Sequence, residues 1–408
     1  MNAIWIFLIL VAIGVSLVRA LATGDATVMQ DVVNSTFSSA KSGFEISLYL
    51  TGVLTLWLGL MRVGESGGAV DLLSRAIAPL FRRLFPGVPA GHAAHGSMTM
   101  NIAANMLGLD NAATPMGLKA MKELQSLNSE PAKATNAEIM FLVLNTSGLT
   151  LIPVSIMAYR QQCGAANPAD IFLPLLLTTG LSTIVGVMIV SIVQRISIFS
   201  RGVMLYVAGL AVAVGLIGMA LGGRSPEEIE RVSTMVASGI LLSVIGLFII
   251  LAMRRRVDVY TTFIDGAKDG FRTAVGIIPY LVAILVGVGM FRASGALDYV
   301  TGGMGWLAGQ MGLDTRFVDA LPTALMKPLS GSGARGFMIE TMNTYGADSF
   351  AGRLSCMFQG ATDTTFFILS VYFGSVGVKE TRHAVACGLA ADLAGIVGAI
   401  ALCYYFFD

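Results

Sequence analysis

Apolar runs that approach twenty residues recur along this 408-residue chain, and they limit its fold more than any other feature. A helix needs roughly 20 mostly apolar residues to cross the hydrocarbon core of a bilayer. Eight segments come near that length, and the sequence predicts a membrane-spanning helix in each. They are residues 3–18, 47–63, 137–159, 171–193, 203–221, 239–253, 274–291 and 389–406.

The overall composition agrees with a chain that is embedded in a lipid bilayer. Hydrophobic residues make up 55% and charged residues only 12%, where soluble domains carry about a quarter charged residues. The net charge of +1 gives no electrostatic reason to bind nucleic acid. No polar segment is long enough to form a separate catalytic module. We expect a polytopic all-α membrane protein with the bilayer as its main partner.

Basic residues give a first indication of membrane orientation. Arg254, Arg255 and Arg256 directly follow a predicted span, and the positive-inside rule places such a cluster in the cytoplasm. We expect Arg19, Lys41 and Lys268 to lie on the same side.

The chain also repeats itself. SAKSGFEISLYLTGVL matches GAKDGFRTAVGIIPYLVAIL, and Lys41 pairs with Lys268 at an offset of 227 (268 − 41). Asp71 pairs with Asp298 at the same offset (298 − 71 = 227). We interpret the chain as two related halves, 1–195 and 257–408, joined by hydrophobic helices in 196–256. Duplicated halves are typical of secondary transporters. Whether the halves run parallel or inverted stays open.

Each half contains two polar stretches within apolar surroundings. In the first half they are residues 101–117 and 145–153, and in the second they are 327–336 and 359–365. Irregular backbone at membrane depth is tolerated only where it is buried in protein or lines a wet cavity. We therefore expect broken or re-entrant helices in both halves and a binding site between the halves near the bilayer midplane.

The polar side chains of these stretches are the candidate substrate-binding residues. Amides, hydroxyls and a carboxylate could replace water around a small polar solute or a cation. The set comprises Asn101, Asn105, Asn111, Asn145, Thr146, Ser330, Ser332, Asp363 and Thr365. The alternative is structural, because hydroxyls and amides also join membrane helices, and Asp363 could cap the segment that follows it.

Two basic residues, Lys327 and Arg335, flank the loop SGSG. They could contact an anionic group near backbone N–H donors. They could equally extend to the membrane interface or balance the charge of Asp363.

Motifs for catalysis or metal binding are absent from the sequence. It contains no nucleophile elbow, no HExxH and no G-x-x-x-x-G-K-[ST] phosphate loop. The four cysteines form no CxxC pair, and His92 and His95 lack a convincing third ligand. We expect no enzyme activity, no cofactor and no metal site.

Several long motifs resemble known families. MNIAANMLGLDNAATPMGLKAMKELQ and FLVLNTSGLTLIPVSIMAYR resemble spore maturation protein A over roughly residues 1–195. IIPYLVAILVGVGMFRASGALD, ALMKPLSGSGARG and DSFAGRLSCMFQGATDTTFFILSVYFGSVGVKETRHA resemble spore maturation protein B over roughly residues 235–408. The chain thus looks like an A–B fusion.

Both families belong to the nucleoside-recognition, or Gate, group, which includes concentrative nucleoside transporters and the membrane part of bacterial ferrous-iron transporters. This resemblance implies two Gate halves with a transporter-like architecture, several passes through the bacterial cytoplasmic membrane, and a link to dehydration of the spore core. It supplies neither a substrate nor site residues. The chain lacks the soluble GTPase domain of the iron transporters, which makes iron a poor candidate.

Taken together, these features predict a secondary transporter that carries a small polar solute together with a coupling cation. A nucleoside-like compound is one candidate for that solute. The alternatives are a non-transporting membrane scaffold and a channel-like conduit. The sequence leaves open the substrate, the coupling ion, the direction of transport, the formation of a homo-oligomer and whether the organism forms spores.

Overall fold

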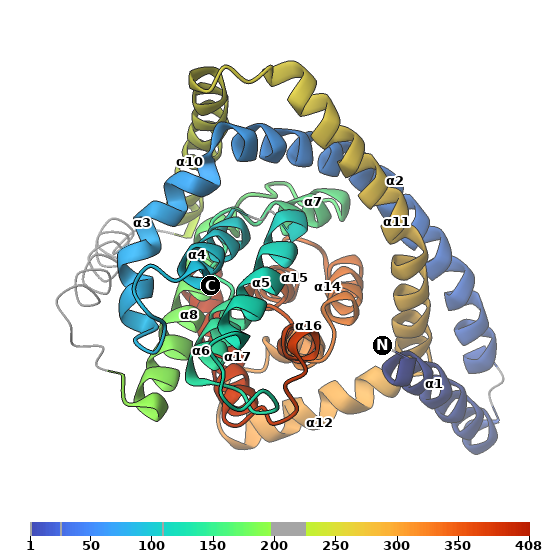
Figure 1. Ribbon diagram of the computed structural model, residues 1–408. Helices are drawn as coiled ribbons and strands as arrows, with labels where there is room; N and C mark the ends of the chain where they lie inside the picture. Colours follow the sequence, from blue (N-terminus) through green and yellow to red (C-terminus); the bar gives the residue numbers. More distant parts are fainter. Residues whose placement is uncertain (1, 25–26, 108–109, 197–225) are drawn as a thin grey trace. The chain divides into compact units, whose positions relative to one another are not determined.

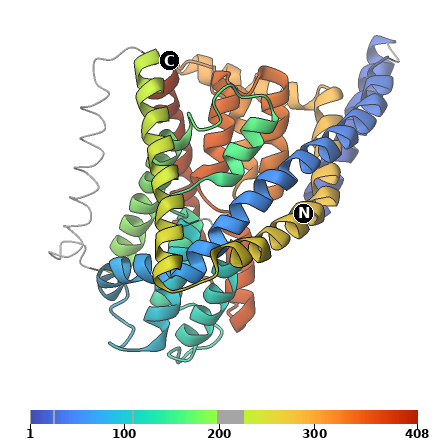
Figure 2. The same cartoon turned by 90° about the horizontal axis from the view of Figure 1, so that it is seen from above.

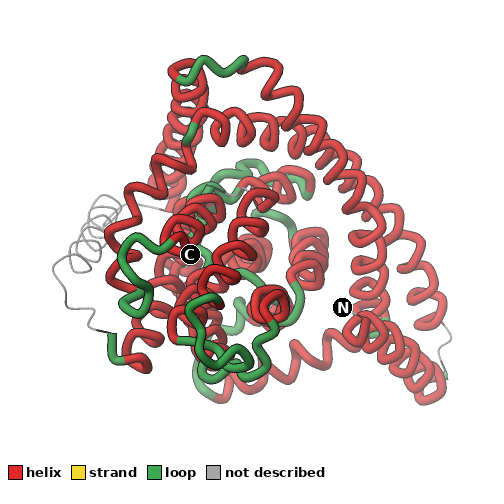
Figure 3. Tube along the Cα trace, viewed as in Figure 1, coloured by secondary structure: helices red, strands yellow, loops and turns green. Residues whose placement is uncertain are grey.

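The computed structural model describes residues 2–24, 27–107, 110–196 and 226–408, and Figure 1 labels its helices. Within these ranges the chain is helical and contains no strand, as Figure 3 shows. Among the described residues, six helices are long and apolar enough to cross a membrane: Ile4–Thr23, Thr27–Gly67, Phe172–Val193, Thr234–Arg254, Val259–Ala293 and Ala384–Phe407. The all-α, multi-pass prediction is confirmed. The span predicted at 203–221 lies outside the described residues.

The two halves contain the same series of helical elements. Each series has a first apolar helix, a very long helix, an amphipathic or short apolar helix, a helical hairpin, a broken pair and a last apolar helix. The first series is α1 (Asn2–Thr23), α2 (Thr27–Gly67), α3 (Ala69–Leu84), α4 (Ala93–Met106), α5 (Asp110–Gln125), α6 (Asn136–Ser147), α7 (Val154–Gln162) and α8 (Phe172–Gln194). The second is α10 (Pro226–Arg254), α11 (Val259–Ala293), α12 (Ala296–Gln310), the 3₁₀ turn η1 (Val318–Ala320), α13 (Leu321–Met326), α14 (Gly331–Tyr345), α15 (Phe350–Ala361), α16 (Thr365–Val376) and α17 (Ala384–Phe407).

The described chain forms two compact units, and each draws on both halves of the sequence. Unit 1 contains residues 1–57, 155–168 and 267–359. Unit 2 contains residues 58–154, 169–266 and 360–408. The halves therefore interleave in space, while their predicted boundaries at 195 and 256 stay predictions. Each unit is described by itself below.

In unit 1 the two very long helices pack against each other in opposite directions. A β-carbon on Gly43 of α2 would lie 3.0 Å from the Cα of Val282 in α11. A β-carbon on Gly270 of α11 would lie 2.8 Å from the Cα of Thr55 in α2. These two contacts are equivalent under the 227-residue repeat, since 43 corresponds to 270 and 55 to 282. Figures 1 and 2 both show the blue α2 beside the yellow α11. Equivalent helices of the two halves thus run antiparallel.

This antiparallel packing bears on the orientation predicted for two lysines. Lys41 lies two residues before Gly43, and Lys268 lies two residues before Gly270, which packs on Thr55. Lys268 is therefore level with about residue 57 of α2, about 16 residues or roughly 24 Å from Lys41 along the helix. The two lysines therefore lie at different levels of the antiparallel pair, and their common membrane side stays a prediction.

The first amphipathic element of each half begins with a glycine in the left-handed region, and an arginine covers it. In unit 1, Gly295 has φ +83° and lies against the guanidinium of Arg19, which donates a 2.7 Å hydrogen bond to Ser294 O. In unit 2, the equivalent Gly68 has φ +87° and lies against the guanidinium of Arg255. A side chain at either glycine would meet both an unfavourable φ and the arginine.

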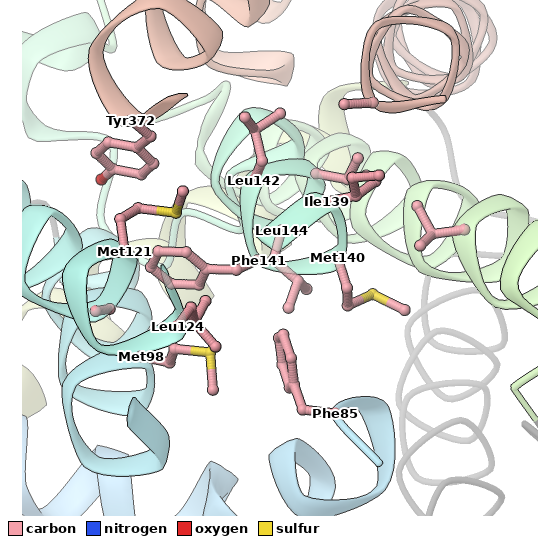
Figure 4. Close-up of a cluster of buried hydrophobic side chains, with 14 of the residues drawn as sticks. Phe85, Met98, Met121, Leu124, Ile139, Met140, Phe141, Leu142, Leu144 and Tyr372 are labelled. Atoms are coloured by element: carbon pink, nitrogen blue, oxygen red, sulfur yellow. The ribbon is translucent and has the colours of Figure 1, made fainter. Parts of the chain in front are cut away.

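The main core of unit 2 forms around α6. Phe141 is fully buried there among Met98, Met121 and Leu124, as Figure 4 shows. Methionine and leucine side chains from α4 and α5 fill the space on one side of α6. This packing holds the α4–α5 hairpin, α6 and α16 together, because each contributes to the same hydrophobic cluster.

The last apolar helices of the two halves also pack antiparallel, in unit 2. A β-carbon on Gly186 of α8 would lie 3.1 Å from Ala391 Cβ, and one on Gly395 of α17 would lie 3.5 Å from Ser182 Cβ. The hydroxyl of Ser182 donates to Ala391 O at 2.9 Å. Small residues let the backbones of membrane helices approach this closely.

Candidate functional site

The segment 137–159, which the sequence predicts as one span, is two helices. α6 ends at Ser147, and Gly148 caps it in the left-handed region with φ 44° and ψ 63°. α7 begins only at Val154, directly after Pro153, whose ring disfavours helical backbone before it. The span predicted at 137–159 is thus not continuous: glycine and proline break it at 148–153, within the polar stretch where a broken helix is expected.

A second break meets the first in unit 2. α15 ends at Ala361 and α16 begins at Thr365. Between them, the backbone N–H of Asp363 donates a 2.7 Å hydrogen bond to the carbonyl of Thr146, near the end of α6. The carbonyl oxygens of a helix end lack intrahelical partners, so this bond satisfies one of them. The broken helices of the two halves therefore contact each other at their breaks.

The α4–α5 hairpin joins the same region of unit 2. The N–H of Leu151, within the first break, donates to Met106 O at the end of α4 at 2.8 Å. Polar side chains of α4 thereby come close to the polar end of α6.

Three of the predicted asparagines lie in one hydrogen-bond network. Asn105 Nδ2 donates to Asn145 Oδ1 at 2.9 Å, and Asn145 Nδ2 donates to Phe141 O at 2.9 Å. Asn101 Nδ2 donates to Ala113 O at 2.8 Å. Asn101 and Asn145 are buried, with 0% and 2% of their surface exposed. The side chain of the fourth, Asn111, lies outside the described part of the structure.

Tyr372 of α16 links these amides, and the sequence analysis missed it. Its hydroxyl accepts from Asn101 Nδ2 and donates to Asn145 Oδ1, both at 3.3 Å. Its ring stacks on Phe141 with centroids 5.8 Å apart and an interplanar angle of 7°. The only sequence signal was a phenol in the apolar helix TFFILSVYFGSV, which is too weak to identify a partner 227 residues away.

The remaining predicted residues of unit 2 lie at the breaks. The hydroxyl of Thr146 donates to Val143 O at 3.0 Å, within its own helix. Asp363 Oδ1 accepts the N–H of Thr364 at 2.7 Å, but it does not cap α16, whose N-cap residue is Thr364 and lacks a side-chain capping bond. Thr365 donates to the carboxylate of Asp392 at 2.7 Å. Asp392, in the last apolar helix, is a second residue that the sequence analysis missed.

The other four predicted residues lie in unit 1, at the α13–α14 hairpin. Ser330 Oγ caps α14 by accepting the N–H of Gly333 at 3.0 Å and lies 3.5 Å from Ser332 Oγ. Lys327 is buried. The guanidinium of Arg335 lies 5.5 Å from the ring centroid of Tyr159, in cation–π geometry. That stacking places Arg335 against an aromatic ring of its own unit.

Unit 1 also contains a polar cavity of about 640 Å³. It lies between α2, α11, α12 and α14, and four serines of α2 face an ion pair in which Arg292 Nη1 is 3.6 Å from Glu340 Oε1. None of the predicted site residues lines this cavity. Its volume is within the usual range for small-molecule sites.

Comparison with known proteins gives results for both halves. The family described as nucleoside recognition, named Gate, matches residues 47–162 and again 274–379, together more than half of the chain. Spore maturation protein A of Bacillus subtilis (strain 168) is 40% identical over 188 residues, which cover 46% of this chain and 92% of that protein. Spore maturation protein B of the same organism is 42% identical over 146 residues, or 36% of this chain and 80% of that protein.

Proposed function

Because the chain belongs to the Gate family of nucleoside-recognition proteins and passes several times through a membrane, we propose that it is a secondary transporter. In this proposal it carries a small polar solute across the bacterial cytoplasmic membrane together with a coupling cation. The names of its two relatives refer to spore maturation, and a role in that process is part of the proposal.

The observation that carries the proposal is the relation between the two halves. Equivalent helices run antiparallel, α2 with α11 in unit 1 and α8 with α17 in unit 2. Both halves contain a broken helix pair, and the breaks contact each other through Asp363 and Thr146. Inverted repeats with discontinuous helices at the substrate site are typical of secondary transporters. A sealed scaffold has no need for either feature.

The chemistry of the amide network supports a neutral, hydroxyl-rich or heteroaromatic solute. Asn101, Asn105, Asn145 and Tyr372 offer uncharged donors and acceptors. Among the residues that the structure describes, none donates a hydrogen bond to the buried Oδ1 of Asn101. The stacked rings of Phe141 and Tyr372 add an aromatic surface. A nucleoside combines the groups that such a site would recognise, namely hydroxyls and a flat heterocycle.

In the proposed mechanism, the solute competes for the hydrogen bonds that now join the amides. Opening the bond between Tyr372 and Asn145 would free one donor and one acceptor at once. Rocking of one half against the other would then expose the site alternately to the two sides.

Uptake into proteoliposomes tests this proposal. The purified chain is reconstituted and challenged with labelled nucleosides, amino acids and small carboxylates, with and without a sodium gradient. We expect saturable, gradient-dependent uptake of one class, reduced at least tenfold by Asn145→Ala. Asn34→Ala, at an exposed amide of α2, is the matched control and should transport normally.

The other outcomes have defined meanings. Flux that does not saturate would instead support a channel-like conduit. Folded protein that neither transports nor is thermally stabilised by any compound of the panel would support the scaffold.

A further inference from the structure

Asp392 is a carboxylate inside a membrane-spanning helix. It occupies the middle of α17, is 3% exposed, and is the only charged residue among the 24 of that helix. Ionisable groups at membrane depth are costly to bury and usually mark pathways or binding sites for ions. The amide network does not include this carboxylate.

A hydroxyl at the second helix break contacts this carboxylate directly. Thr365 Oγ1 donates to Asp392 Oδ2 at 2.7 Å. Thr365 is the first residue of α16 and therefore directly follows the break at 362–364. Any movement of that break would change the surroundings of the carboxylate.

Two glycines bring the same face of α17 close to both breaks. Gly388, Asp392 and Gly395 are spaced four and three residues apart and so share one helix face. A β-carbon on Gly388 would lie 2.8 Å from Thr365 Cγ2 and 3.7 Å from Thr146 Oγ1. A β-carbon on Gly395 would lie 3.1 Å from Thr362 Cγ2 and 3.5 Å from Ser182 Cβ. Thr365 contacts the carboxylate directly, while Thr146, Thr362 and Ser182 lie against the glycines one turn away on the same helix face.

The carboxylate of Asp392 and the hydroxyl of Thr365 present oxygen atoms to each other, and oxygen is the ligand that a hard cation prefers. The helix breaks nearby also leave backbone carbonyls without intrahelical partners, and at the end of α6 Thr146 O accepts the N–H of Asp363 and Ser147 O accepts the hydroxyl of Thr183. Unwound carbonyls of this kind coordinate the coupling ion in other secondary transporters. A single carboxylate with neutral oxygens balances one positive charge, which suits a monovalent ion.

We propose that Asp392 and Thr365, with oxygens of the adjoining breaks, form the binding site for a coupling sodium ion. The inference rests on the proposed cation-coupled transport and assigns the cation to a place apart from the amides. Sodium bound there would join α17 to the start of α16. A bound ion would therefore hold the backbone of the second break, residues 362–364, in one position. The break in turn contacts α6 through Asp363 and Thr146.

Sodium binding to the purified full-length chain tests the site without any solute. Thermal unfolding is followed against NaCl, with choline chloride holding the ionic strength constant and KCl in parallel. We expect a saturable rise in Tm with sodium but not with choline. Asp392→Asn and Thr365→Val should raise the half-saturating sodium concentration at least tenfold. Thr365→Ser, which keeps the hydroxyl, should stay within threefold of wild type.

A matched control removes a carboxylate elsewhere. Asp269→Asn, at an exposed position of α11, should leave the sodium dependence unchanged. If Asp392→Asn does not fold, the comparison of Thr365→Val with Thr365→Ser still decides the matter. The proposal is overturned if sodium stabilises wild type and the Thr365→Val variant equally, if no cation raises Tm, or if only pH changes the stability.

The two proposals can fail separately. Sodium binding that depends on Asp392, in a chain that transports nothing, would retain the ion site and reject the transporter. Uptake that is saturable but insensitive to sodium, with no sodium effect on Tm, would retain the transporter and reject the ion site.

Discussion

At the scale of single residues, Asn145 of unit 2 fills both hydrogen-bonding roles of an amide. Its oxygen accepts from Asn105 and from Tyr372, and its nitrogen donates to Phe141 O. A carboxylate would lose the donor, and an apolar side chain would leave two donors without their acceptor. Unpaired buried polar groups are costly, so the network depends on an amide at this position.

Removing the phenol hydroxyl should cost little stability but change the network. Tyr372→Phe keeps the stacked ring and deletes one acceptor and one donor. We expect the free energy of unfolding to fall by roughly 0.5–1.5 kcal/mol, as for other hydrogen bonds between membrane helices. Unfolding in detergent measures it, and Tyr299→Phe, at an exposed position of α12, should have no effect. A loss equal to that of the control would contradict the hydrogen bonds described.

A glycine of α5 permits this arrangement. In Gly117→Ala the new β-carbon would overlap the Tyr372 hydroxyl and lie 2.9 Å from Asn101 Nδ2. We expect destabilisation of about 1–3 kcal/mol, typical of overpacking. Gly96→Ala in α4 is the control, because nothing lies within 4 Å of its β-carbon. It should be neutral or stabilising, and equal effects of both changes in a thermal unfolding assay would contradict the packing.

At the scale of elements, hydropathy predicts which segments span the membrane better than where they end. The predicted segments 47–63 and 274–291 lie within helices of 41 and 35 residues. The N-terminal parts of these helices contain Ser, Lys and Asp residues, which lower the mean hydropathy without breaking the helix. Conversely, residues 137–159 are long and mostly apolar, yet the helix ends before Gly148. Length and apolarity therefore cannot separate a span from a broken pair without the turn chemistry.

The candidate site was also only partly predictable from local sequence. The amides were visible in the sequence because they are rare in apolar runs, and Asn101, Asn105 and Asn145 do lie together. Tyr372 and Asp392 were missed because their roles come from residues that are distant in sequence. A weak local signal becomes informative only after folding has paired the two halves.

In unit 2, a hydrogen-bonded junction of α6, α8 and α17 contains His383, and the protonation of this histidine should make stability depend on pH. Gln194 Nε2, at the end of α8, donates to Asn136 O at 2.9 Å and faces His383 Nε2 at 3.1 Å. Since the amide nitrogen donates, that imidazole nitrogen must accept and the ring must be neutral. Burial, and secondarily Arg382, lowers the pKa of His383 below its usual 6.5.

The sign follows from linkage. The folded chain binds fewer protons at His383 than the unfolded chain, so this contribution to stability is present above pH 6.5 and is lost as the pH falls below it. The free energy of unfolding should therefore decrease between pH 7.5 and 5.5. His383→Gln should flatten that dependence, and an unchanged slope in the variant would contradict the assignment.

At the scale of the whole molecule, antiparallel equivalent helices imply that equivalent loops face opposite sides of the membrane. The loop after α3 and the loop after α12 are such a pair. Gly87→Cys and Thr315→Cys, each in a chain without its four native cysteines, place a thiol in each loop. We expect a membrane-impermeant maleimide to label one from outside intact cells and the other only in inverted vesicles. Labelling of both from one side would contradict an inverted repeat.

The interleaving of the two halves also has a consequence for biosynthesis. Asn145 meets Tyr372 only after a further 227 residues have been translated. At about 5–20 residues per second, that interval is on the order of 10–45 s. During this time the polar end of α6 is already in or near the bilayer without its partners from α16 and α17. A nascent chain of this design should need an insertase or another holding factor until translation ends.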